Sequence, residues 1–330
     1  MMKTEIAKID ESSLKRAKEL LLSGELVAFP TETVYGLGAC AFNDKAVEKI
    51  FLTKGRPQDN PLIVHIHKNY DIEKIAKITN DYSKKLLKEF TPGAITLVFK
   101  SKGVVAKNNS CGLDTLAVRI PKSKECQEFL AYVDMPISAP SANKSKHTSP
   151  VTAMHVFEDF NGEIPLILDG GRCDVGIEST VVSVVGEIPV ILRPGIITRE
   201  DIIKVVGDCK VVASASEKMS SPGTRYAHYM PKCETAFFDR KDKEKILSLL
   251  KDSQKKGKRV KVLCETDFAT ELQVDKEYIY DLGQGEIEVT KNLYNFLHLA
   301  EKECDLLIGV KVNESYDGVL NRMLKAFSNK

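Results

Sequence analysis

FPTETVYGLG, residues 29–38, continues the short apolar run of residues 26–29 and holds two threonines, a glutamate, a tyrosine and two glycines. The apolar run predicts a strand, and the quoted segment, residues 29–38, predicts the loop into which it leads. A surface turn needs a glycine or a proline, but it has no use for the other residue types. The segment therefore raises the question of which group such a loop holds.

The bulk composition is that of an ordinary globular protein with more than one core. The chain has 330 residues, of which 43% are hydrophobic and 28% are charged. Single hydrophobic cores stop growing at about 250–300 residues, so two domains are expected. The net charge is only +2, from 48 basic and 46 acidic residues. This balance predicts no strong non-specific binding to nucleic acid, although it leaves room for a local basic patch.

The N-terminus and the cysteines predict a cytoplasmic protein. The first residues are charged and lack the apolar core of a signal peptide, and no stretch approaches the roughly 18 apolar residues of a membrane span. Eight cysteines are scattered along the chain without any C-x-x-C spacing. Such cysteines are typical of reduced thiols, so neither a disulfide framework nor a tightly bound protein metal site is expected.

Alternating strands and helices predict two α/β domains joined by a linker. In the first part, strands are expected at 26–29, 62–66, 95–99, 115–120, 165–169, 179–185 and 189–192. Helices are expected from a cap at Ser12 or Ser13 to Gly24, from a cap at Asn43 or Asp44 to Gly55, and at 71–90 and 199–206. Residues 207–233 have no sustained periodicity and predict the linker. Beyond it, strands at 235–239, 259–265, 278–282 and 305–312 alternate with helices at 241–256, 287–303 and 318–327, which predicts a small, mainly parallel domain.

The first motif with chemical potential is KGRPQDNP, residues 54–61, directly after a predicted helix. Two cations two residues apart at a helix end suit a polyphosphate, and the glycine between them lets the backbone approach a ligand. Asn60 offers both a donor and an acceptor. Lys54 fits equally well as a cation that complements the negative end of the helix dipole.

Arg119 and two histidines stand out on predicted strands. Strand alternation places Thr115, Ala117 and Arg119 on one face of TLAVRI, residues 115–120. An arginine among small residues suits the carboxylate or phosphate of a ligand, and it suits an internal ion pair as well. His65 and His67 share a face in a geometry that fits a metal pair, but no third ligand has supporting spacing, so polar contacts in a pocket are favoured.

Two further regions place polar groups at strand ends. SAPSANKSKHTSP, residues 138–150, offers hydroxyls, an amide and backbone N–H groups, and the apolar strand before it favours a buried site over a solvated loop. GIESTVV (176–182) and LRPG (192–195) add Ser179, Thr180 and Arg193 where α/β folds build ligand sites. The sequence contains no G-x-x-x-x-G-K-[ST] and no G-x-G-x-x-G, so the commonest nucleotide-binding folds are not supported.

Taken in order, these motifs resemble one family, the YrdC-type threonylcarbamoyl-AMP synthases, in their long, two-domain form. PTETVYGLG, KGRPQDNPL, SAPSAN, ESTVV and LRPG carry the resemblance in the first domain, and SPGTRYAHYMP (221–231) carries it in the linker. The resemblance implies an α/β fold with a twisted mixed sheet and a deep, positively charged cavity over residues 1–206. It also implies a linker over 207–233 and a smaller Rossmann-like α/β domain over 234–330.

The family's activity gives the expected function. Such nucleotidyltransferases condense L-threonine, bicarbonate and ATP, with Mg²⁺, into threonylcarbamoyl-AMP and pyrophosphate in the cytoplasm. A separate tRNA threonylcarbamoyl transferase complex then uses the product to modify an adenosine next to the anticodon. The opening segment would accordingly form a wall of a small amino-acid pocket.

The resemblance also assigns site residues. L-threonine is assigned to Thr33, His65, Arg119, Ala139 and Ser179. ATP is assigned to Arg56, Asn60, Thr115, Ser141, Ser149, Arg193 and Tyr226. The catalytic constellation is assigned to Lys54, Arg56, Ser141 and Asn143, while Mg²⁺ ligands are left unassigned.

Two other functions remain open from the sequence. The same fold suits a module that binds tRNA or double-stranded RNA without adenylation, although the near-neutral charge argues against it. The second open function is that of a different acyl-adenylate or carbamoyl transferase with the same cavity. The aromatic and basic residues of the linker, Tyr226 among them, predict a lid over the ATP site rather than a passive tether.

Overall fold

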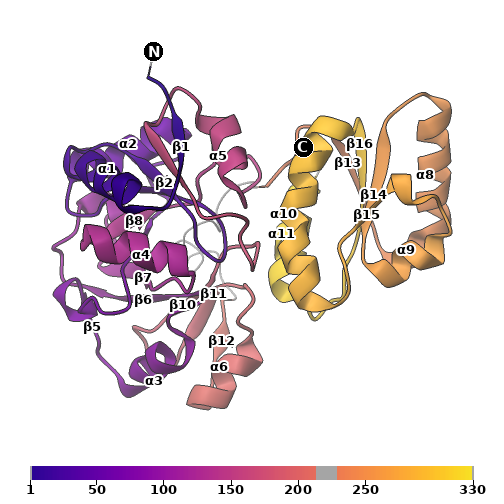
Figure 1. The fold of residues 1–330 in the computed structure, drawn as a ribbon. Helices are drawn as coiled ribbons and strands as arrows, with labels where there is room; N and C mark the ends of the chain where they lie inside the picture. The colour runs from indigo at the N-terminus through magenta and orange to yellow at the C-terminus, as the bar shows by residue number, and fades with distance from the viewer. Residues whose placement is uncertain (1, 213–228, 329–330) are drawn as a thin grey trace. The chain divides into compact units, whose positions relative to one another are not determined.

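A computed structural model describes residues 2–212 and 229–328 of the chain (Figure 1). The described residues fall into two units. The first comprises residues 2–145, 149–174 and 178–212, and the second comprises residues 146–148, 175–177 and 229–328. In these ranges no helix is long and apolar enough to span a membrane. The predicted lid, together with Tyr226, falls largely on residues 213–228, which lie outside the described ranges.

A twisted mixed sheet organises the first unit (Figure 1). Its described strands run in the order β1-β9-β2-β3-β8-β4-β7-β6-β10-β11-β12, and β5 pairs with β6. The sheet is mixed because β4 and β7 are parallel while β6 and β7 are antiparallel. The strands are β1 (Glu5–Lys8), β2 (Val27–Phe29), β3 (Gly36–Cys40), β4 (Ile63–His65), β5 (Ala76–Lys77), β6 (Ile95–Ser101), β7 (Thr115–Arg119), β8 (Ile137–Ala139), β9 (Leu166–Asp169), β10 (Thr180–Ser183), β11 (Val190–Arg193) and β12 (Lys210–Val211).

Helices pack on this sheet through their apolar faces. They are α1 (Glu11–Leu22), α2 (Asp44–Lys54), α3 (Asp81–Phe90), α4 (Lys124–Val133), α5 (Ala153–Phe160) and α6 (Arg199–Val206). α1 and α4 enclose one core with β2, β8 and β9 that contains Phe29 and Phe129. α3 and α6 enclose another with β6, β7 and β10 that contains Leu86, Phe99 and Ile202.

The central strands of the sheet have two unlike faces. Val118 of β7 points into the large apolar cluster that α3 and α6 cover, whereas Ile63 of β4 and Ala117 of β7 belong to a small cluster. Because side chains alternate along a strand, His65 and Arg119 emerge on the same face as the small cluster. The polar residues of the central strands therefore lie on the face opposite to α3 and α6.

The opening segment forms the end of one strand, a short loop and most of a second strand. β2 and β3 take its two ends, so the loop covers only residues 30–35, and the prediction of a loop over 29–38 was too long. The two strands pair antiparallel, with Val27 opposite Gly38. A Cβ atom on Gly38 would lie 2.8 Å from Ile137 Cγ2 and 3.1 Å from the Val27 carbonyl oxygen. Glycine is needed there because the neighbouring strands leave no room for a side chain.

Capping residues explain where the helices begin and end. The side chain of Asn43 caps α2, and Gly55 ends it in the left-handed conformation at φ 61°, as the sequence predicted. For α1 the predicted cap was wrong, because Asp10 caps the helix in place of Ser12 or Ser13.

The predicted helix over residues 71–90 was wrong in its first half. That half contains a 3₁₀ turn, Ile72–Lys74, and the short strand β5. α3 begins only after Asn80, whose side chain accepts a hydrogen bond from the Ser83 N–H. Among the elements that the sequence patterns did not predict are β1, β3, α4 and α5 in this unit and α9 in the second.

The second unit is a smaller α/β structure. Its strands are β13 (Glu234–Phe238), β14 (Val260–Cys264), β15 (Ile279–Asp281) and β16 (Leu306–Val310), and its helices are α8 (Lys243–Lys255), α9 (Thr266–Leu272), α10 (Gly285–Glu303) and α11 (Asp317–Ala326). The strands run in the order β13-β16-β14-β15, and every pair is parallel. The predicted fold class, a large mixed α/β sheet plus a smaller parallel α/β domain, is confirmed.

We predict that Gly38→Ala lowers the free energy of unfolding by about 1–3 kcal/mol, because the added methyl group overlaps a closely packed strand and side chain. The midpoint of urea unfolding measures the effect. Gly186→Ala is the matched control, since the nearest atom to its Cβ would be 3.7 Å away, and we expect a change below about 0.5 kcal/mol. Equal midpoints for the two variants would contradict the close approach of β2 and β8 to Gly38.

Candidate active site

Arg119, the last residue of β7, is a buried cation with three partners. Its side chain is 4% exposed. Nη1 donates a hydrogen bond to Thr33 Oγ1 at 2.6 Å, and Nε donates to the Gly93 carbonyl at 3.4 Å. Nη2 lies 2.8 Å from Oε1 of Glu32. The internal ion pair that the sequence left open for Arg119 is therefore present, and two segments, the loop of residues 30–35 and Gly93, fix the plane of its guanidinium.

A chain of hydroxyl contacts orients Thr33. Thr31 Oγ1 donates to the Val34 carbonyl at 2.7 Å and accepts from the Thr33 N–H at 3.1 Å. The Thr31 and Thr33 hydroxyl oxygens are 2.8 Å apart. Because the single hydroxyl proton of Thr31 goes to Val34, the Thr33 hydroxyl donates to Thr31 and accepts from Arg119. Thr31 thus sets the direction in which the Thr33 oxygen presents its lone pairs.

Main-chain hydrogen bonds fasten the opening segment to the SAPSAN region. The Leu37 N–H donates to the Pro140 carbonyl at 2.9 Å, and the Ala142 N–H donates to the Tyr35 carbonyl at 2.8 Å. The Tyr35 hydroxyl donates to the Gly171 carbonyl at 2.7 Å and so anchors the loop at its far end. Two motifs that lie about a hundred residues apart in the sequence therefore form one structure.

His65 lies on β4 directly beside Arg119 on β7. Its ring meets Phe29 edge-on with 5.7 Å between centroids, and its Nδ1 lies 3.2 Å from the Ile63 carbonyl oxygen. Burial, and secondarily the charge of Arg119, lower the pKa of His65 from 6.5 to about 3. His65 is therefore a neutral imidazole at physiological pH.

His67 does not share this position. It follows the end of β4, and its Nε2 lies 3.1 Å from Asp134 Oδ1. The histidine pair that the sequence weighed as a metal site is therefore not formed. Within residues 2–212 and 229–328, no group of three or more His, Cys, Asp or Glu side chains converges as metal ligands.

Ser179 joins the residues expected for threonine to one expected for ATP. Its Oγ lies 2.7 Å from Thr96 Oγ1. Arg193 donates to the Ser179 carbonyl at 2.9 Å from Nη2 and at 3.3 Å from Nε. Ser179 and Arg193 are both almost fully buried. The two predicted ligand sets therefore touch at this residue.

Lys54, in the last turn of α2, directs its ammonium at the loop that carries two other predicted catalytic residues. Nζ donates to the Ser141 carbonyl at 2.6 Å and also to the Asn143 carbonyl. Burial, and then the nearby Arg56, lower the pKa of Lys54 well below its ordinary value. The observed contacts of Lys54 hold the loop in shape, a role that neither the polyphosphate nor the helix-dipole interpretation included.

The other residues expected for ATP have polar partners of their own. Arg56 donates from Nε to the Asn60 carbonyl at 3.2 Å and from Nη2 to the Pro61 carbonyl at 3.0 Å. Ser149 donates to Glu178 Oε1 at 2.6 Å. The contacts of Arg56 lie within its own loop, whereas the contact of Ser149 joins two segments that are 29 residues apart in the chain.

The predicted residues fall into three contacting groups and a remainder. The groups are Thr33 with His65 and Arg119, Ser179 with Arg193, and Lys54 with Ser141 and Asn143. Ala139 lies in β8 opposite Ile63 of β4. Thr115 begins β7, about 13 Å along the strand from Arg119.

Four residues that contact the predicted set were not singled out from the sequence. They are Thr31, Glu32, Thr96 and Glu178. Thr31 and Glu32 stood in the opening segment, and Thr96 alternates onto the polar face of a predicted strand. Glu32 is the acidic residue of that segment, so a search of the segment for a counter-ion to Arg119 would have found it.

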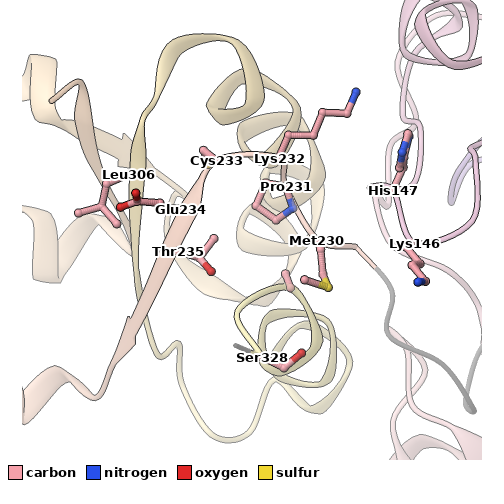
Figure 2. Close-up of a pocket in the computed structure, with 11 residues that line it drawn as sticks. Lys146, His147, Met230, Pro231, Lys232, Cys233, Glu234, Thr235, Leu306 and Ser328 are labelled. Atoms are coloured by element: carbon pink, nitrogen blue, oxygen red, sulfur yellow. The ribbon is translucent and has the colours of Figure 1, made fainter. Parts of the chain in front are cut away.

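A separate pocket of about 670 Å³ lies in the second unit (Figure 2). It is lined by residues 230–235 together with Lys146, His147, Leu306, Ala326 and Ser328. None of the predicted site residues is among them, and no sequence motif assigns it a ligand.

Two family profiles match this chain. The Sua5, YciO and YrdC profile, described as telomere recombination, matches residues 19–195. The profile described as the C-terminal domain of threonylcarbamoyl-AMP synthase matches residues 197–328.

Curated relatives match over almost the whole length. The threonylcarbamoyl-AMP synthase of Pyrococcus abyssi is 38% identical over 329 residues, which cover 97% of this chain and 95% of the relative. The chain belongs to the threonylcarbamoyl-AMP synthase family. The Bacillus subtilis threonylcarbamoyl-AMP synthase is 39% identical over 326 residues, with 96% and 93% covered. The crystal structure of P. abyssi Sua5 complexed with L-threonine matches with a TM-score of 0.88 and 36% identity, over 99% of this chain and 98% of that chain.

Membership of the threonylcarbamoyl-AMP synthase family confirms the resemblance drawn from the ordered motifs. It also makes the chain an enzyme of the nucleotidyltransferase kind.

The neutral state of His65 predicts how the stability of this threonylcarbamoyl-AMP synthase family member depends on pH. The unfolded chain takes up a proton on this histidine below pH 6.5, whereas the folded protein does so only near pH 3. Between these values the unfolded state binds more protons, so stability falls as the pH falls, by up to about 1.4 kcal/mol per pH unit from this group. We expect wild type to lose more stability between pH 7 and pH 5 than His65→Asn, which keeps a donor near the Ile63 carbonyl. Urea unfolding at the two pH values measures both slopes, and equal slopes would contradict a buried, neutral His65.

Proposed function

We propose that this protein is an L-threonylcarbamoyladenylate synthase, which forms threonylcarbamoyl-AMP and pyrophosphate from L-threonine, bicarbonate and ATP. The observation that carries the proposal is the buried Arg119, with Thr33 and His65 beside it. A guanidinium fork suits a carboxylate, and the neighbouring hydroxyl and imidazole suit the polar groups of a small hydroxy amino acid. The P. abyssi relative solved with L-threonine supports threonine as that amino acid.

The proposed reaction has two steps. The threonine ammonium loses a proton, and the resulting amine combines with bicarbonate to form N-carboxythreonine and water. The new carboxylate on the nitrogen attacks the α-phosphorus of ATP, and pyrophosphate leaves. Negative charge develops on phosphate oxygens, and positioned cations stabilise it. We assign this stabilisation to Arg56 and Arg193, and we assign to Lys54 the holding of Ser141 and Asn143. The carboxylate nucleophile is already ionised and needs no general base.

We propose that Mg²⁺ would be bound together with ATP, where it would supply positive charge beside the phosphate groups. Mg²⁺ commonly keeps several waters and binds through substrate phosphates and one or two carboxylates. Glu178, which accepts a hydrogen bond from Ser149, is a carboxylate in contact with a residue proposed for ATP and would be its protein ligand.

The domain boundaries and the fate of the product are proposed from the same family resemblance. We propose that residues 1–206 form the catalytic domain, that 207–233 link it to the rest of the chain, and that 234–330 form the C-terminal domain. The product would pass in the cytoplasm to a tRNA threonylcarbamoyl transferase complex.

We predict that pyrophosphate release from ATP requires both L-threonine and bicarbonate, because the nucleophile is assembled from the two. A coupled pyrophosphate assay with each component omitted in turn tests this. Release at an undiminished rate without threonine would overturn the proposed function.

We predict that Arg119→Ala raises the KM for L-threonine about ten- to 150-fold, the loss of one charge-assisted hydrogen bond, while the KM for ATP changes less than about threefold. Steady-state kinetics with each substrate varied give the two values. Arg199→Ala is the control, because Arg199 is an exposed side chain on α6 whose Nε donates to the Cys209 carbonyl, and no ligand is assigned to it. If Arg119→Ala folds and keeps the wild-type KM for threonine, Arg119 is purely structural.

A further inference from the structure

Glu32 and Arg119 form a buried ion pair that is incompletely satisfied. Their side chains are 8% and 4% exposed, and Oε1 of Glu32 lies 2.8 Å from Nη2 of Arg119. Among the described residues, neither carboxylate oxygen of Glu32 nor Nη2 of Arg119 has a partner in hydrogen-bond geometry. Buried polar atoms without such partners are rare in native proteins and call for an explanation. A polar ligand that completes the arrangement is one such explanation.

The formal charges of Glu32 and Arg119 sum to zero, and the titratable side chains that interact most directly with the pair are neutral. The neighbouring His65 is neutral because burial and then Arg119 lower its pKa to about 3. Burial raises the pKa of the Cys126 and Cys173 thiols, which interact electrostatically with both members of the pair, so these thiols are also neutral at pH 7.

We propose that Glu32 is a positioning and specificity-determining residue that makes the Arg119 site select a zwitterionic amino acid over a simple carboxylate anion. The inference rests on the proposed function, because it takes threonine as the ligand whose carboxylate meets Arg119. Glu32 acts in two ways, by holding the guanidinium in the orientation that Thr33 and Gly93 also enforce and by placing a negative charge within reach of the ligand.

Electrostatics gives the direction of the selectivity. A ligand carboxylate on Arg119 lies within a few ångströms of the Glu32 carboxylate, because both contact one guanidinium. Like charges at that separation repel strongly at the low effective dielectric of a buried site. The α-ammonium of an amino acid offsets this repulsion, whereas a ligand without the amine leaves it uncompensated. Glu32 therefore penalises anions that Arg119 alone would accept.

A purely structural role for Glu32 makes a different prediction. If Glu32 only kept Arg119 folded in place, its removal would weaken every carboxylate ligand by the same factor. The ratio of affinities for a zwitterion and an anion of the same shape would then stay constant, whatever happened to the absolute values.

The experiment compares L-threonine with (R)-3-hydroxybutanoate, which keeps the carboxylate and the hydroxyl but lacks the amine. Isothermal titration calorimetry on the full-length protein measures both dissociation constants for wild type, Glu32→Gln and Glu32→Asp. We expect wild type to bind L-threonine more tightly by about tenfold or more, Glu32→Gln to reduce that preference by about tenfold, and Glu32→Asp to retain it. Glu265→Gln, a buried glutamate in the second unit, is the matched control and should leave both constants unchanged.

Each outcome decides the inference. An unchanged ratio in a folded Glu32→Gln protein would assign Glu32 a structural role alone. If Glu32→Gln does not fold, the two dissociation constants of the wild-type protein still test the inference. A dissociation constant for (R)-3-hydroxybutanoate within about threefold of that for L-threonine would exclude the proposed selectivity. Threonine-dependent pyrophosphate release tests the proposed function separately, so the proposed function can hold even if the inference about Glu32 fails.

Discussion

The buried ion pair between Arg119 and Glu32 is the constraint on which the polar face of the first unit depends. Removing an arginine from water is unfavourable unless the side chain is paired and hydrogen-bonded, yet Arg119 ends a central strand at 4% exposure. The loop of residues 30–35 supplies a carboxylate and a hydroxyl to it, and Gly93 supplies a carbonyl. The unusual composition of the opening segment follows from this demand, because Thr31, Glu32 and Thr33 together serve one cation.

The two faces of the central strands explain why the site lies where it does. One face is covered by α3 and α6 and filled with large apolar side chains. On the other, small residues such as Ala117 leave room for long polar side chains. Gly38 has a different role, because its lack of a side chain lets β2 and β8 approach it closely. A ligand site needs rigid support on one side and space on the other, and period-two alternation along β4 and β7 provides both.

Local rules predicted much of the fold, whereas the roles of individual polar residues depended on long-range contacts. Asn43 and Gly55 mark the ends of α2 because caps act within one helical turn. The helix over 71–90 was overextended because Asn80, a strong cap, lay inside an otherwise helical pattern. The partners of Lys54 are main-chain carbonyls, which every residue carries, so no sequence pattern can reveal them. The alternation along TLAVRI predicted which face of the strand carries Arg119. It could not predict that the counter-ion is Glu32, because Glu32 lies 87 residues earlier in the chain.

The contacts that hold the cations of the candidate site show what each can offer a substrate. Arg119 contacts the Glu32 carboxylate, and the two formal charges of this pair sum to zero. Arg56 donates to the Asn60 and Pro61 carbonyls, and Arg193 donates to the Ser179 carbonyl and approaches its hydroxyl. These contacts fix the direction of each guanidinium, and guanidinium groups stay charged near neutral pH. Lys54 also donates to carbonyls, but burial and then Arg56 lower its pKa, so its contacts serve the shape of the loop. In the proposed reaction the zwitterionic substrate therefore meets a pair of zero net charge, and the triphosphate meets guanidinium groups that the main chain orients.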